Sequence, residues 1–117
     1  MFLNLNHQKL DVYHSTQQLV YECYKLSIQI PAEEKFGMIS QIRRAALSVH
    51  LNLAEGSARK SELERKRFFE ISRSSLVEID AALDISNTLG YLEKIDIEPL
   101  GKELLTCFKM LTQMIKS

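Results

Sequence analysis

Apolar residues recur at intervals of three and four along this chain, which is the spacing of amphipathic helices. A first helix is predicted over residues 10–30, and Pro31 ends it because the proline ring clashes with the preceding helical turn. A second helix is predicted to begin near Glu33 or Glu34, whose carboxylates suit the positive end of a helix dipole, and to end at Gly56 as a left-handed C-cap. The predicted inner faces are Leu10, Tyr13, Val20, Tyr24 and Ile28 in the first helix, and Phe36, Ile39, Ile42, Ala46, Val49 and Leu53 in the second.

Two further helices follow with the same periodicity. Ser61 and Glu64 have the spacing of a capping box, so a third helix is predicted to begin there and to run to Gly90. Asp96 is predicted to cap a fourth helix, with Pro99 in its first turn. The predicted inner faces are Phe69, Ser72, Leu76, Ile79, Leu83 and Ser86 in the third helix, and Ile97, Leu100, Leu104, Cys107, Phe108, Leu111, Met114 and Ile115 in the fourth.

No segment shows the alternation of a strand. The sequence therefore predicts an all-α fold, an antiparallel up-down-up-down four-helix bundle built by a single domain over residues 1–117.

Composition narrows the class of protein. The chain is 45% hydrophobic and 26% charged, as soluble globular proteins are. Cys23 and Cys107 form no CxxC motif, so two buried free thiols in a reducing compartment are expected. The N-terminal residues lack the pattern of a signal peptide, and no apolar run approaches the roughly 20 residues that span a bilayer. These features predict a cytoplasmic protein with no membrane partner.

Charge is distributed unevenly although the chain is neutral. All six arginines lie within residues 43–73, and residues 41–73 hold eight basic side chains against four acidic ones, whereas the remainder holds seven against eleven. A hairpin centred near residues 58 and 59 would place Arg44 level with Arg73, roughly 20 Å from the turn. The turn itself would gather a basic cluster: Arg59, Lys60, Arg65, Lys66 and Arg67.

Two interpretations fit the basic cluster. In the first interpretation, the cluster is a face that binds phosphate, because an uneven charge distribution affects which partners bind and not which fold forms. Alternatively it is a solvated helix surface, because Glu62 and Lys66 are spaced as an i,i+4 pair and Glu64 and Arg67 as an i,i+3 pair.

The second predicted helix has more than one buried side. A narrow polar stripe runs beside its core stripe and consists of Gln41, Arg44, Ser48, Asn52 and Glu55. Leu47, Leu51 and Ala54 form a further apolar side. A helix of this kind has neighbours on several sides, and in a bundle of four helices some of those neighbours would be other subunits. The predicted residues of this subunit contact are Gln41, Arg43, Arg44, Leu47, Leu51, Asn52, Glu55 and Arg73.

Catalytic and metal-binding patterns are missing. A di-iron bundle needs Glu-x-x-His motifs, and none of the histidines (His7, His14 and His50) has a Glu three residues before it, so they are interpreted as surface residues. There is no CxxCH motif and no glycine-rich phosphate loop. Ser72, Ser74 and Ser75 have no histidine nearby in sequence and suit close helix packing. We therefore expect no enzyme, no catalytic residue, no metal and no cofactor.

Several strings in order resemble one protein family. They are "SQIRRAALSVHLNLAEG" (residues 40–56), "ERKRFFEISRSSLVEID" (64–80) and "LGYL" (89–92), supported by "LDVYHS" (10–15) and "IPAEEKFGMISQ" (30–41). Together they resemble a bacterial four-helix-bundle family associated with open reading frames in intervening sequences of large-subunit ribosomal RNA genes. Tyr13 departs from the Trp usual there. The shared motif residues are Gln41, Arg43, Arg44, Asn52, Glu55, Gly56, Arg59, Glu64, Arg65, Arg67 and Phe68.

The resemblance implies an up-down bundle assembled into a ring of five subunits. It also points to a related group, the accessory proteins of diversity-generating retroelements, whose basic ring engages a reverse transcriptase and nucleic acid. We predict a non-enzymatic homo-oligomer, a homopentamer, that binds the RNA or DNA backbone through Arg59, Lys60, Arg65, Lys66 and Arg67. The alternative is a scaffold or accessory protein that engages an acidic partner protein or a reverse transcriptase.

Overall fold

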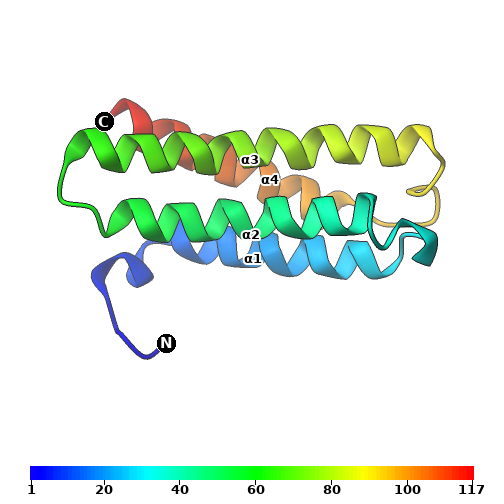
Figure 1. Ribbon diagram of the computed structural model, residues 1–117, viewed down its shortest axis with the longest axis horizontal. Helices are drawn as coiled ribbons and strands as arrows, with labels where there is room; N and C mark the ends of the chain where they lie inside the picture. The colour runs from blue at the N-terminus through cyan, green and yellow to red at the C-terminus, as the bar shows by residue number, and fades with distance from the viewer.

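The computed structural model describes all 117 residues. Four helices lie side by side in a rod of 44 × 29 × 24 Å (Figure 1). They are α1 (Asp11–Ile28), α2 (Met38–Ser57), α3 (Glu62–Thr88) and α4 (Glu98–Lys116), with two short 3-10 turns, η1 (Asn6–Lys9) and η2 (Ala32–Glu34). The structure contains no strand, so the prediction of an all-α fold with four helices is confirmed.

The chain turns back at each connection, and each helix packs against two others. α2 lies between α1 and α3, and α4 closes the arrangement by packing against α3 and α1 (Figure 1). Three side-chain contacts near mid-length fix the relative levels of the helices: Thr16–His50 (2.8 Å), Ser48–Ser75 (2.8 Å) and Arg73–Thr112 (3.1 Å). One apolar cluster fills the space between the helices.

The predicted inner faces of α2, α3 and α4 are largely confirmed. The fully buried side chains include Ile42, Val49, Leu53, Leu76, Ile79, Leu100 and Leu111. Burying a side chain of this size contributes about 1.5–3 kcal/mol, so the shared core is the main source of stability.

The predicted inner face of α1 is wrong at its two ends, although Tyr13 and Val20 are partly buried against the core as expected. Leu10 and Ile28 are exposed, and the buried positions are Val12, Thr16, Leu19, Cys23, Leu26 and Ser27. The hydroxyls of Thr16 and Ser27 donate to the carbonyls of Tyr13 and Tyr24, one turn earlier, at 3.1 and 2.8 Å. Because these hydroxyls are satisfied within the helix, polar residues can occupy core positions and break the apolar stripe.

The start of α2 also differs from the prediction. Residues 32–34 form η2, and α2 begins at Met38, which leaves Phe36 90% exposed rather than in the core. A carboxylate oxygen of Glu34 accepts from the Met38 N–H at 3.2 Å, so Glu34 satisfies an N–H of the first turn from outside the helix.

Gly56 is not the predicted left-handed cap. It lies inside α2, buried against α3, and α2 continues to Ser57. A Cβ at Gly56 would lie 2.7 Å from the Cβ of Phe68 and 3.0 Å from the Cε1 of Phe69. The glycine is therefore required for the close approach of the two helices.

The remaining boundaries follow the prediction more closely. The Ser61 hydroxyl accepts from the Glu64 N–H at 3.3 Å, although the reciprocal bond of a capping box is not formed. Gly90 has φ +80°, as expected of the glycine that ends α3. Asp96 accepts from the Glu98 N–H at 3.1 Å, although Ile97 is the residue that precedes α4.

Candidate nucleic-acid interface

The five basic residues of the α2–α3 turn have different local roles. Arg65 reaches back from α3, and its Nη1 donates to the main-chain carbonyls of Arg59 and Lys60 at 3.1 and 2.6 Å. These carbonyls follow the end of α2, where main-chain acceptors lack helical partners. Arg65 therefore holds the turn in place. No sequence motif predicts this role.

Two other residues of the cluster are engaged by local carboxylates. Arg59 pairs with Glu55 at 3.1 Å and lies over the ring of Phe68, 4.9 Å from its centroid. Lys66 pairs with Glu62 at 3.3 Å. Both pairs have i,i+4 spacing, and such exposed pairs contribute only about 0.3–0.5 kcal/mol. An incoming anion could therefore compete for either cation.

Lys60 and Arg67 complete the cluster and differ from the other three. Both side chains are exposed, and neither forms a hydrogen bond or an ion pair within the chain. They are therefore the two cations of the turn that have no side-chain partner in the folded subunit.

Charge is polarised along the whole rod. The mid-length contacts divide it into a turn end (residues 1–19, 48–75 and 108–117) and an opposite end (residues 20–47 and 76–107). The turn end holds nine Lys and Arg against five Asp and Glu, a net charge of +4. The opposite end holds six against ten, a net charge of −4. The fold thus adds Lys9 of η1 and Lys109 and Lys116 of α4 to the basic residues of the α2–α3 hairpin at one end of the rod.

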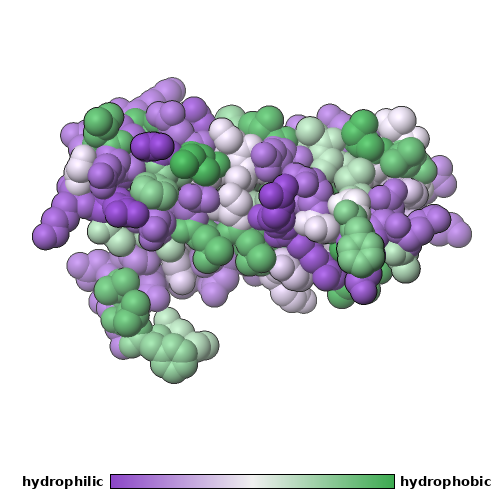
Figure 2. All heavy atoms as spheres, in the orientation of Figure 1, coloured by the Kyte–Doolittle hydropathy of each residue, from purple (hydrophilic) through white to green (hydrophobic).

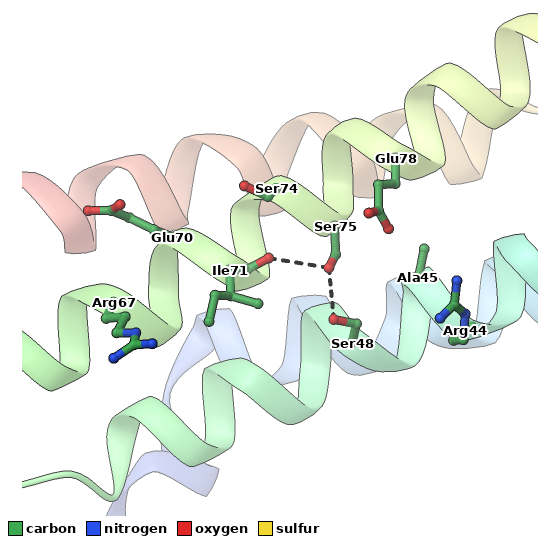
Figure 3. Close-up of a pocket in the computed structure, with 9 residues that line it drawn as sticks. All are labelled: Arg44, Ala45, Ser48, Arg67, Glu70, Ile71, Ser74, Ser75 and Glu78. Atoms are coloured by element: carbon green, nitrogen blue, oxygen red, sulfur yellow. Dashed lines mark hydrogen bonds between the residues drawn. The ribbon is translucent and has the colours of Figure 1, made fainter.

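A polar groove runs between α2 and α3 (Figure 3). It has a volume of about 630 Å³, with Arg67 near one end and Arg44 near the other. Between them the Ser75 hydroxyl donates to Ser48 Oγ at 2.8 Å, and Glu70 and Glu78 stand on the α3 side. The sequence does not reveal this groove, because Ser48 and Ser75 lie 27 residues apart and come together only when α2 pairs with α3.

The predicted register of the hairpin is wrong. Arg44 lies by the groove near Ser75 and Glu78, not level with Arg73. Arg73 points to α4 instead, donating to the Thr112 hydroxyl at 3.1 Å with its guanidinium 5.7 Å from the ring centroid of Phe108. The Ser48–Ser75 contact, one turn further along α2, sets this register and places Arg44 near Glu78 of α3.

The polar stripe of α2 is hydrogen-bonded within the subunit. Arg44 donates to Gln41 at 3.1 Å, and Asn52 donates to the carbonyl and hydroxyl of Ser48 at 2.9 and 3.0 Å. Leu51 on the adjoining side is 58% exposed, and Leu47 is also exposed.

Arg43 belongs to a different surface from this stripe. It faces α1, where its Nε donates to the Ser27 hydroxyl at 2.8 Å and its guanidinium lies 4.8 Å from the ring centroid of Tyr24.

Other chemistry-bearing groups are engaged inside the fold. His50 is half-buried rather than on the surface, hydrogen-bonded to Thr16 and packed 4.6 Å from the ring of Tyr13, and burial followed by nearby His7 lowers its pKa. The predicted buried free thiols are confirmed, and burial raises the pKa of Cys23 and Cys107 to about 12. No group of three or more His, Cys, Asp or Glu side chains is arranged to hold a metal ion.

Comparison with known proteins identifies a family. The family model described as 23S rRNA-intervening sequence protein matches residues 8–113, which covers all four helices except the end of α4. No curated protein matches the chain. None of the helices is long and apolar enough to cross a membrane.

Proposed function

Because the chain belongs to the family of 23S rRNA-intervening sequence proteins, we propose that it is a non-enzymatic homo-oligomer that binds the phosphate backbone of RNA or DNA through its turn end. The observation that carries this proposal is the net charge of +4 at one end of a neutral rod. Such a field attracts a polyanion and orients it, and it adds little to the stability of the fold.

Lys60 and Arg67 are the leading phosphate ligands of this proposal, because they need no internal partner to be broken. Arg59 and Lys66 join them by exchanging weak pairs with Glu55 and Glu62 for phosphate. Arg65 acts mainly by holding the turn. Binding is largely independent of base sequence, because the Phe68 ring beside the cluster is already covered by Arg59.

Assembly strengthens such binding. We propose that up-down bundles join through the exposed Leu47 and Leu51 side of α2 into a ring of five. Several turn ends on one particle would engage one nucleic-acid strand together, so that weak sites give useful avidity. Leu51→Glu would place a charge in the subunit contact and reduce the mass measured by light scattering. A wild-type mass of one subunit would contradict the assembly.

Fluorescence anisotropy with labelled RNA and DNA tests the binding site. We expect affinity to fall with salt at a log–log slope of about −0.9 per neutralised phosphate on duplex DNA, and about −0.7 on single strands. Lys60→Glu with Arg67→Glu should weaken binding to all sequences alike. The matched control is Lys94→Glu with Lys102→Glu, two exposed lysines of the opposite end, which should bind like the wild type.

The second candidate function is a scaffold whose basic end engages an acidic protein, such as a reverse transcriptase. The Phe68 ring among the basic residues is covered by Arg59, so it offers no free face on which a base could stack, and this favours a protein partner. A pull-down from the native cell with and without nuclease separates the two. Protein partners that survive nuclease treatment, together with no anisotropy change at low salt by an intact oligomer, would favour the scaffold.

A further inference from the structure

The first four residues form an apolar arm beside the bundle. Phe2 is 87% exposed and Leu3 is 74% exposed, and the arm hangs below α1 and α2 as a green patch in the space-filling view (Figures 1 and 2). Its root is fixed, because the Leu5 N–H donates to Gln8 Oε1 at 2.7 Å and Asn4 turns the backbone with φ +52°. Three consecutive large apolar side chains on an anchored root form a surface that water disfavours.

An apolar cleft of matching character opens between α3 and α4. Its volume is about 300 Å³, and it is lined by Leu76, Val77, Asp80, Leu104, Leu105 and Phe108. Leu105 is 64% exposed and Phe108 is 41% exposed, so the subunit leaves the mouth of this cleft uncovered. The size suits one or two large apolar side chains.

The arm and the cleft lie on opposite faces of the bundle. Leu3 and Leu5 line a groove with Leu51 and Ala54 of α2, whereas the cleft is bounded by α3 and α4 (Figure 1). The bundle is at least 24 Å thick, and four extended residues span only about 13 Å. The arm therefore cannot reach the cleft of its own subunit.

We propose that the arm of one subunit inserts Phe2 and Leu3 into the α3–α4 cleft of the next subunit. This rests on the proposed homo-oligomer and names the two surfaces that meet. Charge agrees with it, since the arm is rooted at the turn end, which has a net positive charge, and Asp80 lines the cleft at the opposite end, which has a net negative charge. Two different surfaces on opposite faces make a head-to-tail contact, the kind that closes into a ring.

Cross-linking between differently marked subunits tests the contact. Phe2→Cys protein is mixed with Leu105→Cys protein, dissociated, reassembled and oxidised, and we expect a disulfide-linked dimer. The native thiols are buried and give little background. Phe2→Cys mixed with Ile85→Cys is the matched control, because Ile85 is exposed on α3 outside the cleft and should not cross-link.

Subunit dissociation gives an independent measurement. Phe2→Glu with Leu3→Glu, and separately Leu105→Glu, should each raise the dissociation constant at least tenfold, or about 1.4 kcal/mol. Ile28→Glu places the same charge at another exposed apolar site and should leave the constant unchanged.

The outcomes separate this inference from the proposed function. An oligomeric wild type whose mass is unaffected by either variant, with Phe2→Cys cross-linking only to Leu51→Cys in the same chain, would overturn the arm exchange alone. A monomeric wild type would overturn the proposed oligomer, and with it this contact.

Discussion

The two ends of the bundle are built differently. At the turn end, α2 and α3 are joined by residues 58–61. Gly56 packs closely against Phe68 and Phe69 of α3, and Arg65 donates to two carbonyls of the turn. At the opposite end, the connections at residues 29–37 and 89–97 are longer. They are tied by a hydrogen bond from the Tyr91 hydroxyl to a Glu34 carboxylate oxygen at 2.8 Å.

One end is thus held by close packing and main-chain acceptors, and the other by a hydrogen bond to an ionisable carboxylate. Close packing at Gly56 and the Arg65 hydrogen bonds hold the turn that carries the basic side chains, which suits recognition of a charged partner. The connection at the opposite end depends on an ionisable carboxylate and therefore responds to pH.

The core between the two ends contributes most to the free energy of unfolding. Leu76→Ala should lower the free energy of unfolding by about 2–5 kcal/mol, because Leu76 is fully buried at mid-length and its removal leaves a cavity. Chemical denaturation measures this change, with exposed Ile85→Ala on the same helix as the control. Equal stability of the two variants would contradict the assignment of the inner face of α3.

Gly56→Ala tests the close packing at the turn end. The new Cβ would meet the Phe68 Cβ and the Arg65 carbonyl at 2.7 and 3.2 Å, so α2 and α3 must move apart, at a cost of about 1–3 kcal/mol. The gain in helix propensity, about 1 kcal/mol, offsets part of this loss. Gly101→Ala is the matched control, because a Cβ there would have no atom within 4 Å apart from its chain neighbours and the nearby backbone of its own helix. We expect thermal melts to show a stabilised Gly101 variant and a destabilised Gly56 variant.

Arg65→Met tests the second interaction that holds the turn, the hydrogen bonds from the Arg65 side chain. Methionine keeps an unbranched side chain but removes the donors to the carbonyls of Arg59 and Lys60, and we expect a loss of about 1 kcal/mol. Hydrogen exchange should locate faster opening at the turn. Arg67→Met, which breaks no internal hydrogen bond, should leave exchange there unchanged, and equal exchange in both variants would mean that Arg65 does not hold the turn.

Tyr91→Phe should have the smallest effect on stability and the clearest pH dependence. The Tyr91 hydrogen bond, and then the Met38 N–H, hold the pKa of Glu34 below its usual value of 4.5. A lowered folded-state pKa stabilises the protein above the usual value, and this contribution is lost as pH falls through the lowered pKa. Wild-type and variant melting temperatures should therefore differ at neutral pH and converge in acid. Exposed Tyr21→Phe should show no such convergence.

Local sequence determined the number of helices and most of their ends. Pro31, Ser61 and Gly90 act through rules of backbone geometry and capping that need no distant partner. The inner faces of α2, α3 and α4 were also predictable, because their apolar residues are regularly spaced. The sequence strings were specific enough to predict the family, which the family model confirms over residues 8–113.

Tertiary structure decided which polar and small residues lie inside. Thr16 occupies the core because its hydroxyl finds both the Tyr13 carbonyl and His50, a partner 34 residues away. Gly56 serves close packing because α3 lies against it. The pairing of Ser48 with Ser75 between the two helices separates Arg44 from Arg73. Periodicity reports spacing along one helix, but burial, register and the partners of each arginine depend on contacts between helices that exist only in the folded chain.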